Sequence, residues 1–222
     1  MPTLKKDLLF DLITSLTKSE KRNFRLYAKK IQQNSEVLFL QLFDYLEKQD
    51  FFDVQQLLVD LPNLQKKQIA NLKRNLYNHL LVSLRLLYSK KQIALQIREF
   101  IDYAEILYNK GLYLQALKIL GRAKKLAIKT HQDILHLEIV AFESSIESRH
   151  ITRSSTERMS DLMQESEDTN QTISRVSELS NLKLYLQRVF INCGHLQTGD
   201  VLNAVNRKFL EQIGNGQIDN QS

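Results

Sequence analysis

Residues 110–126 read KGLYLQALKILGRAKKL, and this stretch contains a turn followed by most of a helix. Gly111 comes directly after a segment of helical spacing over 92–109. It is well placed to end that helix, because glycine adopts the left-handed backbone conformation without strain. Small and large apolar residues then recur at helical spacing as far as Thr130. The stretch therefore predicts two helices joined by a tight turn.

The composition extends this prediction to all 222 residues. Leucine supplies 38 of them, and Lys, Gln, Glu and Ala are also frequent; all of these favour helices. Only 6 Gly and 2 Pro interrupt the sequence, too few for the frequent turns of a β-sandwich. No glycine precedes Gly111, and neither GxxxxGK[ST] nor GxGxxG follows it, which excludes the common Gly-rich phosphate loops. We expect an all-α protein.

The spacing of apolar residues predicts further helices on both sides of this hairpin. Their expected ranges are 4–16, 18–31, 35–48, 53–61 and 65–90 before it, and a helix from 133 after it. Thr17 and Glu20 have the capping-box spacing, which supports a helix start at Lys18. The apolar stripe of residues 65–90 is wide enough for a central helix that is contacted on two sides.

The C-terminal third has a less regular pattern. Residues 153–175 are rich in Ser, Thr and acids, so we expect a solvated helix there with a break near Thr169. A good helical pattern returns over 176–193. In domain terms we expect an N-terminal helical region with basic faces at 1–92, helical hairpins at 93–213, and a disordered tail at 214–222.

The segment Glu99–Thr130 resembles one tetratricopeptide repeat, a helix–turn–helix unit with small residues where its two helices cross. The match is carried by Phe100, Tyr103, Ala104 and Leu107, by Gly111 and Tyr113 at the turn, and by Ala116, Leu120 and Ala123. The resemblance implies that the alanines allow close helix approach and that Leu120 and Tyr113 fill the flank. The proline that normally ends the second helix is absent. A weaker second copy begins around Leu184, with its turn at Gly199 and Asp200.

Over about residues 10–145 the chain is also similar to a group of uncharacterised bacterial helical-repeat proteins. The similarity is carried by LTKSEKRNFRLYA, NLYNHLLVSLRLLYS and GLYLQAL. It implies a tetratricopeptide-like (TPR-like) fold, in which antiparallel helical hairpins stack into a right-handed array. It brings no known activity and no site residues. Because such arrays normally stack three or more units, the sequence fits either a short array or part of a longer one.

The charge is unevenly distributed along the chain. Residues 1–130 hold 23 Lys and Arg against 12 Asp and Glu, a net charge of +11, whereas residues 131–222 hold 8 against 13, a net charge of −5. A basic half suits nucleic acid, an acidic protein or a membrane surface. It can equally pair with the acidic half of its own chain or of a second copy, which makes self-association one expectation.

Helical spacing gathers part of this charge on one face. Lys18, Arg22, Arg25 and Lys29 fall within a narrow wedge of the predicted helix 18–31, opposite Phe24, Tyr27, Ala28 and Ile31. Lys66, Lys67, Lys73 and Arg74 extend the basic patch if the helices lie side by side. A nucleic-acid-binding helical protein that uses this N-terminal basic face is therefore the alternative function.

Stacked helical hairpins form a groove that accepts a peptide, and this favours a non-catalytic protein–protein interaction module or scaffold. The groove residues would come from the first helix of each pair, and the candidates are Arg98, Asp102, Glu105 and Asn109. The expected partner is a protein or peptide, with nucleic acid as the less favoured partner and no membrane.

Residues for chemistry are sparse, and we expect no enzyme, no cofactor and no metal. The five histidines, His79, His131, His136, His150 and His195, include no HExxH pair. The lone Cys193 follows an apolar stretch and suits a buried thiol in a reducing compartment, so with no signal-peptide pattern we expect a cytoplasmic protein. Glu165, Glu167 and Asp168 are interpreted as a solvated face, because they lack the pattern of a calcium loop.

Overall fold

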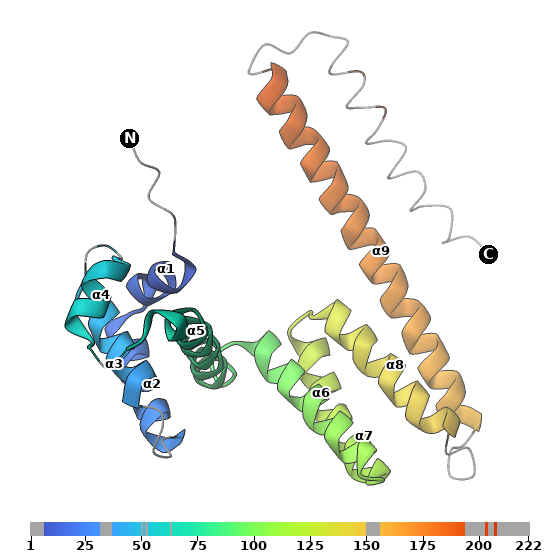
Figure 1. Ribbon diagram of the computed structural model, residues 1–222. Coiled ribbons are helices and arrows are strands. Elements are labelled where there is room, and N and C mark those ends of the chain that lie inside the picture. Colours follow the sequence, from blue (N-terminus) through green and yellow to red (C-terminus); the bar gives the residue numbers. More distant parts are fainter. Residues whose placement is uncertain are drawn as a thin grey trace. The chain divides into compact units, whose positions relative to one another are not determined.

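The computed structural model describes residues 7–31, 37–49, 51, 53–62, 64–149, 156–193, 203 and 207. Within these residues all regular secondary structure is helical and no strand occurs, which confirms the all-α prediction (Figure 1). None of the helices in the described part combines the length and apolar composition that a membrane crossing requires. The chain divides into two compact units, Met1–Gln96 and Ile97–Ser222.

The first unit is built around one long central helix. Its helices are α1 (Leu8–Ser15), α2 (Lys18–Ile31), α3 (Val37–Leu46), α4 (Val54–Asp60) and α5 (Lys66–Tyr88). The central helix α5 contacts α1, α2 and α3, as its wide apolar stripe predicted. Asp7 caps α1 by accepting bonds from the backbone N–H groups of Leu9 and Phe10, and Asp53 caps α4 in the same way through Gln55.

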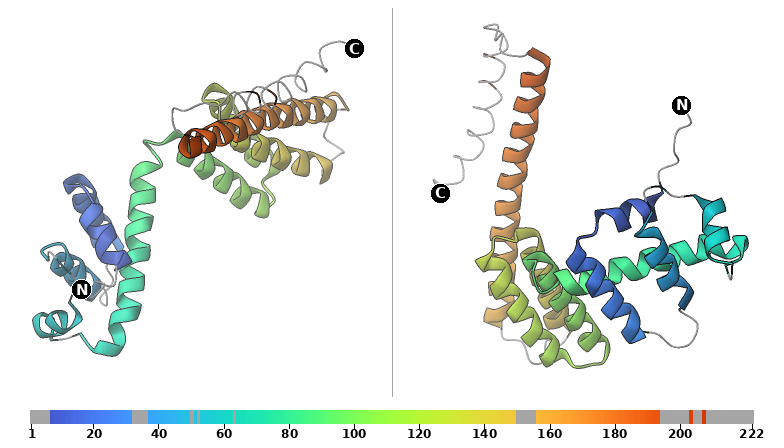
Figure 2. Two further views of the ribbon diagram at one scale, coloured as in Figure 1. Left: turned by 90° about the horizontal axis from the view of Figure 1, so that it is seen from above. Right: turned by 90° about the vertical axis from the view of Figure 1, so that its left-hand side faces the viewer.

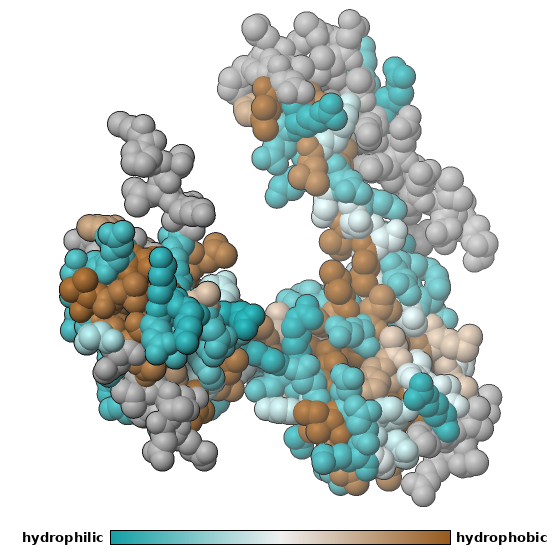
Figure 3. All heavy atoms as spheres, viewed as in Figure 1, coloured by the Kyte–Doolittle hydropathy of each residue, from teal (hydrophilic) through white to brown (hydrophobic). Residues whose placement is uncertain are grey.

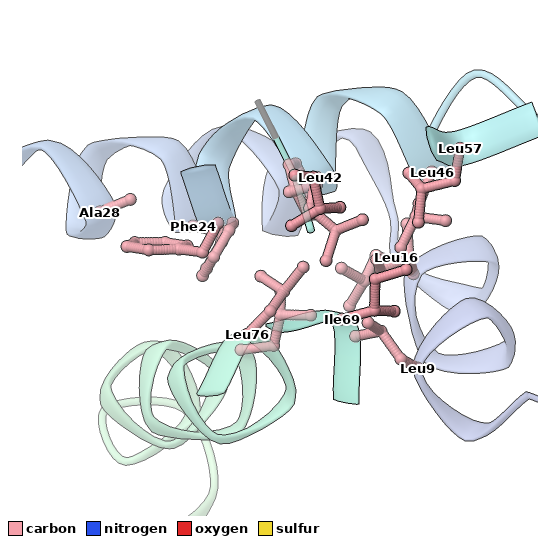
Figure 4. Close-up of a cluster of buried hydrophobic side chains, with 14 residues drawn as sticks. Leu9, Leu16, Phe24, Ala28, Leu42, Leu46, Leu57, Ile69 and Leu76 are labelled. Atoms are coloured by element: carbon pink, nitrogen blue, oxygen red, sulfur yellow. The ribbon is translucent and has the colours of Figure 1, made fainter. Parts of the chain in front are cut away.

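Apolar side chains from all five of these helices meet in the core of the first unit (Figure 4). Phe24, Leu42, Leu46 and Leu76 are all buried there. The rings of Phe24 and Phe43 lie 4.7 Å apart between centroids, so α2 and α3 are joined by aromatic packing. Full burial of such side chains contributes roughly 1.5–3 kcal/mol each and holds the short helices in place.

Polar contacts fix α2 antiparallel to α5. The Glu20 carboxylate accepts a 2.6 Å bond from the Tyr88 hydroxyl, and this bond holds the pKa of Glu20 below its usual value. The Asn23 amide donates to the Ser83 hydroxyl at 3.3 Å. Glu20 also closes the predicted capping box with Thr17, since its carboxylate accepts from the Thr17 backbone N–H at 2.6 Å. One carboxylate therefore both starts α2 and ties it to α5.

The second unit is a run of helices with a regular spacing. Its helices are α6 (Ile93–Asn109, whose first turn precedes the unit boundary), α7 (Tyr113–Lys129), α8 (Asp133–Arg149) and α9 (Thr156–Cys193). The first three are each 17 residues long, and each begins 20 residues after the one before it. The middle helix α8 packs against α7 on one side and α9 on the other.

The two turns between these equal helices have the same backbone form. Gly111 has φ 77° and His131, 20 residues later, has φ 53°. After each, a backbone N–H reaches back five residues at 2.9 Å, from Leu112 to Leu107 and from Gln132 to Ala127. The prediction that Gly111 ends a helix is confirmed. The second turn repeats this geometry with a histidine in the left-handed conformation.

The predicted break near Thr169 is wrong, because α9 runs uninterrupted from Thr156 to Cys193 (Figure 2). The Thr169 hydroxyl donates to the carbonyl of Glu165 at 2.7 Å, within the helix, and its side chain is buried near His136. The polar residue thus packs against α8 and does not end the helix. The weak second repeat needs a turn at Gly199 and Asp200, which lie outside the described residues, as does the tail 214–222.

Candidate interaction surfaces

The basic face expected on α2 is only partly available. Lys18, Arg22 and Lys29 are exposed, and none of them forms an ion pair among the described residues. Arg25 turns toward α3. Its guanidinium donates to Asp44 at 2.9 and 3.1 Å, also pairs with Glu47, and lies 5.2 Å from the Phe43 ring centroid.

Among the cations that were expected to extend this face, some are paired within the protein and others are exposed. Lys21, a further cation of α2 that was not among them, lies 3.7 Å from the Glu47 carboxylate. Lys73 pairs with Asp7, the residue that caps α1. The Arg74 guanidinium donates to the Asn71 side chain at 3.1 Å, and Lys66 and Lys67 are exposed. Acids of the same unit therefore neutralise several of the N-terminal cations.

The candidate groove residues of α6 lie on one exposed face. Arg98, Asp102, Glu105 and Asn109 are all exposed, and their helical spacing places them on the same side of the helix. The Arg98 guanidinium lies 3.9 Å from the Glu138 carboxylate on α8. The exposed face of α6 therefore adjoins that of α8, and we call the two together the α6–α8 face.

An aromatic cluster holds one end of the α6–α8 face together. The ring of Tyr108 lies 5.4 Å from that of Tyr113 and 5.8 Å from that of Phe142, the latter edge-on. Arg149 of α8 donates to the Tyr108 hydroxyl at 2.7 Å. Tyr108 was not singled out from the sequence, although it lies one helical turn after Ala104 on the packed side.

The residues expected to pack the hairpin take two different positions. Ala104, Ala116, Leu120 and Ala123 have no exposed surface. Tyr113 is 36% exposed and contacts Tyr108, so it covers the edge of the helix pair and does not fill it.

A cluster of ionic side chains joins α7, α8 and α9, and we call it the interhelical ionic cluster. Lys124 of α7 lies 2.5 Å from Glu143 of α8 and 2.7 Å from Glu165 of α9. Arg158 contacts Glu143 at 2.9 Å, and Nε2 of His136 donates to Glu165 at 2.7 Å. Two carboxylates thus meet two permanent cations and an imidazole, so the charges are paired within the cluster.

Glu165 is not part of a solvated face, in contrast to the sequence interpretation. Burial by itself would raise the pKa of its carboxyl group. Hydrogen bonds from Lys124 and His136 outweigh burial and hold that pKa below its usual value. Its neighbours Glu167 and Asp168 are exposed, as expected. The sequence signal available was the seven-residue spacing from Arg158 to Glu165, which puts both on the side of α9 that faces α8.

An open surface pocket of about 570 Å³ lies beside the cluster, between the start of α8 and α9. Its lining includes the imidazoles of His131 and His136 and the carboxylates of Asp133, Asp161 and Asp168. Within the described residues, no group of three or more His, Cys, Asp or Glu side chains is arranged to hold a metal ion. His150 and His195 lie outside those residues, and so does the side chain of Cys193.

A second basic face was missed by the sequence analysis. Lys118, Arg122, Lys125 and Lys129 of α7 are all exposed, and we call them the α7 basic face. Their spacing of four, three and four residues repeats that of the expected face on α2. The spacing alone was sufficient to find them.

The distal half of α9 carries exposed apolar side chains. Val176, Leu179, Leu186 and Phe190 are 39–63% exposed and share one side of the helix. Figure 3 shows apolar side chains in brown at intervals along the visible side of α9, between teal ones.

We compared the chain with models of known protein families, with curated proteins and with solved structures, and it matches none of them. In the part of the chain that the structure describes, the regular secondary structure is all helical, and the chain divides into two compact units.

Proposed function

We propose that the chain is a non-catalytic protein-interaction module, built as a TPR-like right-handed array of helical hairpins. A protein or peptide partner binds along the α6–α8 face. The regular architecture of the second unit supports this proposal. Helices of equal length at a 20-residue spacing, joined by two turns of the same form, are typical of stacked hairpins.

The observation that carries the proposal is that side chains of α6 and α8 contact each other near both ends of the α6–α8 face. The Arg98–Glu138 pair lies on this face, and the bond from Arg149 to Tyr108 joins the same two helices near its end. A surface whose geometry is already set loses little conformational entropy when a partner binds. Ala141 and Ser148 of α8 are exposed and small, and their helical spacing from Glu138 puts them on the same face. They leave room there for the side chains of a partner.

The charges of this face suggest the chemistry of the partner segment. Asp102 and Glu105 are exposed acids one turn apart, and Arg98 precedes them by one further turn. Charge complementarity sets the orientation and partner choice of an interface more than its raw affinity. The partner segment would therefore place basic side chains opposite Asp102 and Glu105.

The test places a photo-cross-linking amino acid at position 105 of the full chain, which is expressed in the cells that naturally produce the protein. The matched control carries the cross-linker at Lys67, an exposed position on α5. We expect one discrete cross-linked protein from position 105 and none of the same mass from position 67. Adding Asp102→Lys, which leaves the Arg98–Glu138 pair in place, should reduce that cross-link at least tenfold while the circular dichroism spectrum stays unchanged. Equal cross-linking from both positions, or a yield that is unaffected by the charge reversal, would contradict the proposal.

A further inference from the structure

The helix α7 is strongly one-sided in charge. It contains five cations, Lys118, Arg122, Lys124, Lys125 and Lys129, and no acid. Its inner side is fully buried and consists of Ala116, Leu120, Ala123 and Ala127. Four of the five cations form the α7 basic face on the side away from this core.

The fifth cation of α7 has a structural role. Lys124 points inward, is 12% exposed and binds Glu143 and Glu165. The four cations of the α7 basic face form no ion pair with any carboxylate among the described residues. Their charge is therefore not used to hold this unit together.

The α7 basic face is a row of cations whose length suits contact with a chain of phosphate groups. At a rise of 1.5 Å per residue, Lys118 and Lys129 lie about 16 Å apart along the helix axis, with two further cations between them. Gly121 lies beside the row, and a methyl group placed there would meet nothing within 4 Å. The helix surface next to the row is therefore open at this position.

We propose that the α7 basic face binds the phosphate backbone of a nucleic acid, a function separate from protein binding at the α6–α8 face. Protein interfaces usually depend on a few buried aromatic or apolar anchors. The four positions of the row contain none, although the exposed Leu114 lies on the same side one turn before Lys118 and the exposed Ile128 lies beside the row. Phosphate binding needs no such anchor, because its main driving force is charge neutralisation with release of counterions. The face makes no base-specific contact of its own, so binding is not sequence-selective.

Binding through four phosphate contacts should depend measurably on the salt concentration. The logarithm of the binding constant should fall with the logarithm of the salt concentration, with a slope of about −3.6 for duplex DNA and about −2.8 for a single strand. We would measure this by fluorescence anisotropy of labelled 20-nucleotide DNA and RNA, single-stranded and duplex, from 25 to 300 mM KCl, with the full chain.

Two variants of equal charge separate a site from a general effect of net charge. The first is Lys118→Gln, Arg122→Gln, Lys125→Gln and Lys129→Gln on α7. The second is Lys18→Gln, Arg22→Gln, Lys29→Gln and Lys30→Gln on α2, where all four cations are likewise exposed and without an ion pair among the described residues. We expect the α7 variant to bind at least thirtyfold more weakly with a flatter salt slope, and the α2 variant to change less than threefold.

Three results would overturn the proposal. One is no binding of any of the nucleic acids at 25 mM KCl. Another is an equal loss in both variants, which would mean that net charge alone drives binding. The last is tight binding of polyglutamate through the α7 basic face without binding of nucleic acid, which would assign the face to an acidic protein. Circular dichroism melting of both variants checks that these exposed substitutions leave the helices intact.

Discussion

Glu143 is the most deeply buried charge in the described part of the second unit, with its side chain only 3% exposed. It accepts charge-assisted contacts from Lys124 of α7 and Arg158 of α9. A single carboxylate therefore joins the three helices that surround the interhelical ionic cluster. Removing it takes away the carboxylate that Arg158 contacts and leaves Lys124, which is only 12% exposed, with Glu165 as its remaining carboxylate, so the loss is costly.

We expect Glu143→Ala to lower the free energy of unfolding by about 3 kcal/mol, the usual cost of breaking a buried pair from one side. Urea denaturation followed by circular dichroism measures this. Glu167→Ala, an exposed acid in the middle of α9, is the control and should change stability by less than about 0.5 kcal/mol. Similar values for the two variants would show that the cluster contributes little.

Glu165 should make stability depend on pH. Because its folded pKa is below the ordinary value of 4.5, its ionised form is favoured by the fold. Its contribution is therefore complete above pH 4.5 and is lost as the pH falls through the lower folded pKa. The stability difference between the protein and Glu165→Gln, measured in urea, should shrink between pH 6 and pH 3.5. A difference that stays constant over this range would contradict the assignment.

At the scale of the element, two glycines in the second unit have opposite roles. Gly111 lies in a turn at φ 77°, where a side chain is strained, whereas Gly121 lies inside α7 with open space around it. We expect Gly111→Ala to destabilise the protein by about 1–2 kcal/mol. Gly121→Ala should stabilise it by about 0.5–1 kcal/mol, because alanine favours the helix. Thermal melting of the two variants gives the signs, and equal signs would be inconsistent with the turn geometry.

Comparison of individual helices shows which of their features could be predicted from the sequence. Helix α2 has the bounds predicted from its capping box and apolar spacing, because those signals are local to the helix. The predicted break near Thr169 was wrong because the deciding contact is not local to the helix. A run of polar residues looks like a loop, but the Thr169 side chain is buried against α8, and no local pattern reveals that neighbour.

At the scale of the whole molecule, the two units have separate cores. Phe24→Ala, at a fully buried position of the first unit, should remove about 3–5 kcal/mol. We expect hydrogen exchange to accelerate in α2, α3 and α5 and to stay unchanged in α7 and α8. Leu120→Ala in the second unit should give the reverse pattern. A uniform loss of protection across both units in either variant would mean that they unfold as one.

The sequence alone established that the protein is helical, where most helices begin and end, and which side of α2 is buried. These properties depend on hydrogen bonds and side-chain spacings within a few residues, so the local sequence contains them. Only the tertiary structure decided which charges are available. Arg25 pairs with Asp44, 19 residues away in the sequence, and Lys124 pairs with Glu165, 41 residues away. The cations of the α7 basic face form no ion pair with a carboxylate among the described residues. Such pairings depend on which helices come together in three dimensions, and spacing along the chain does not contain that information.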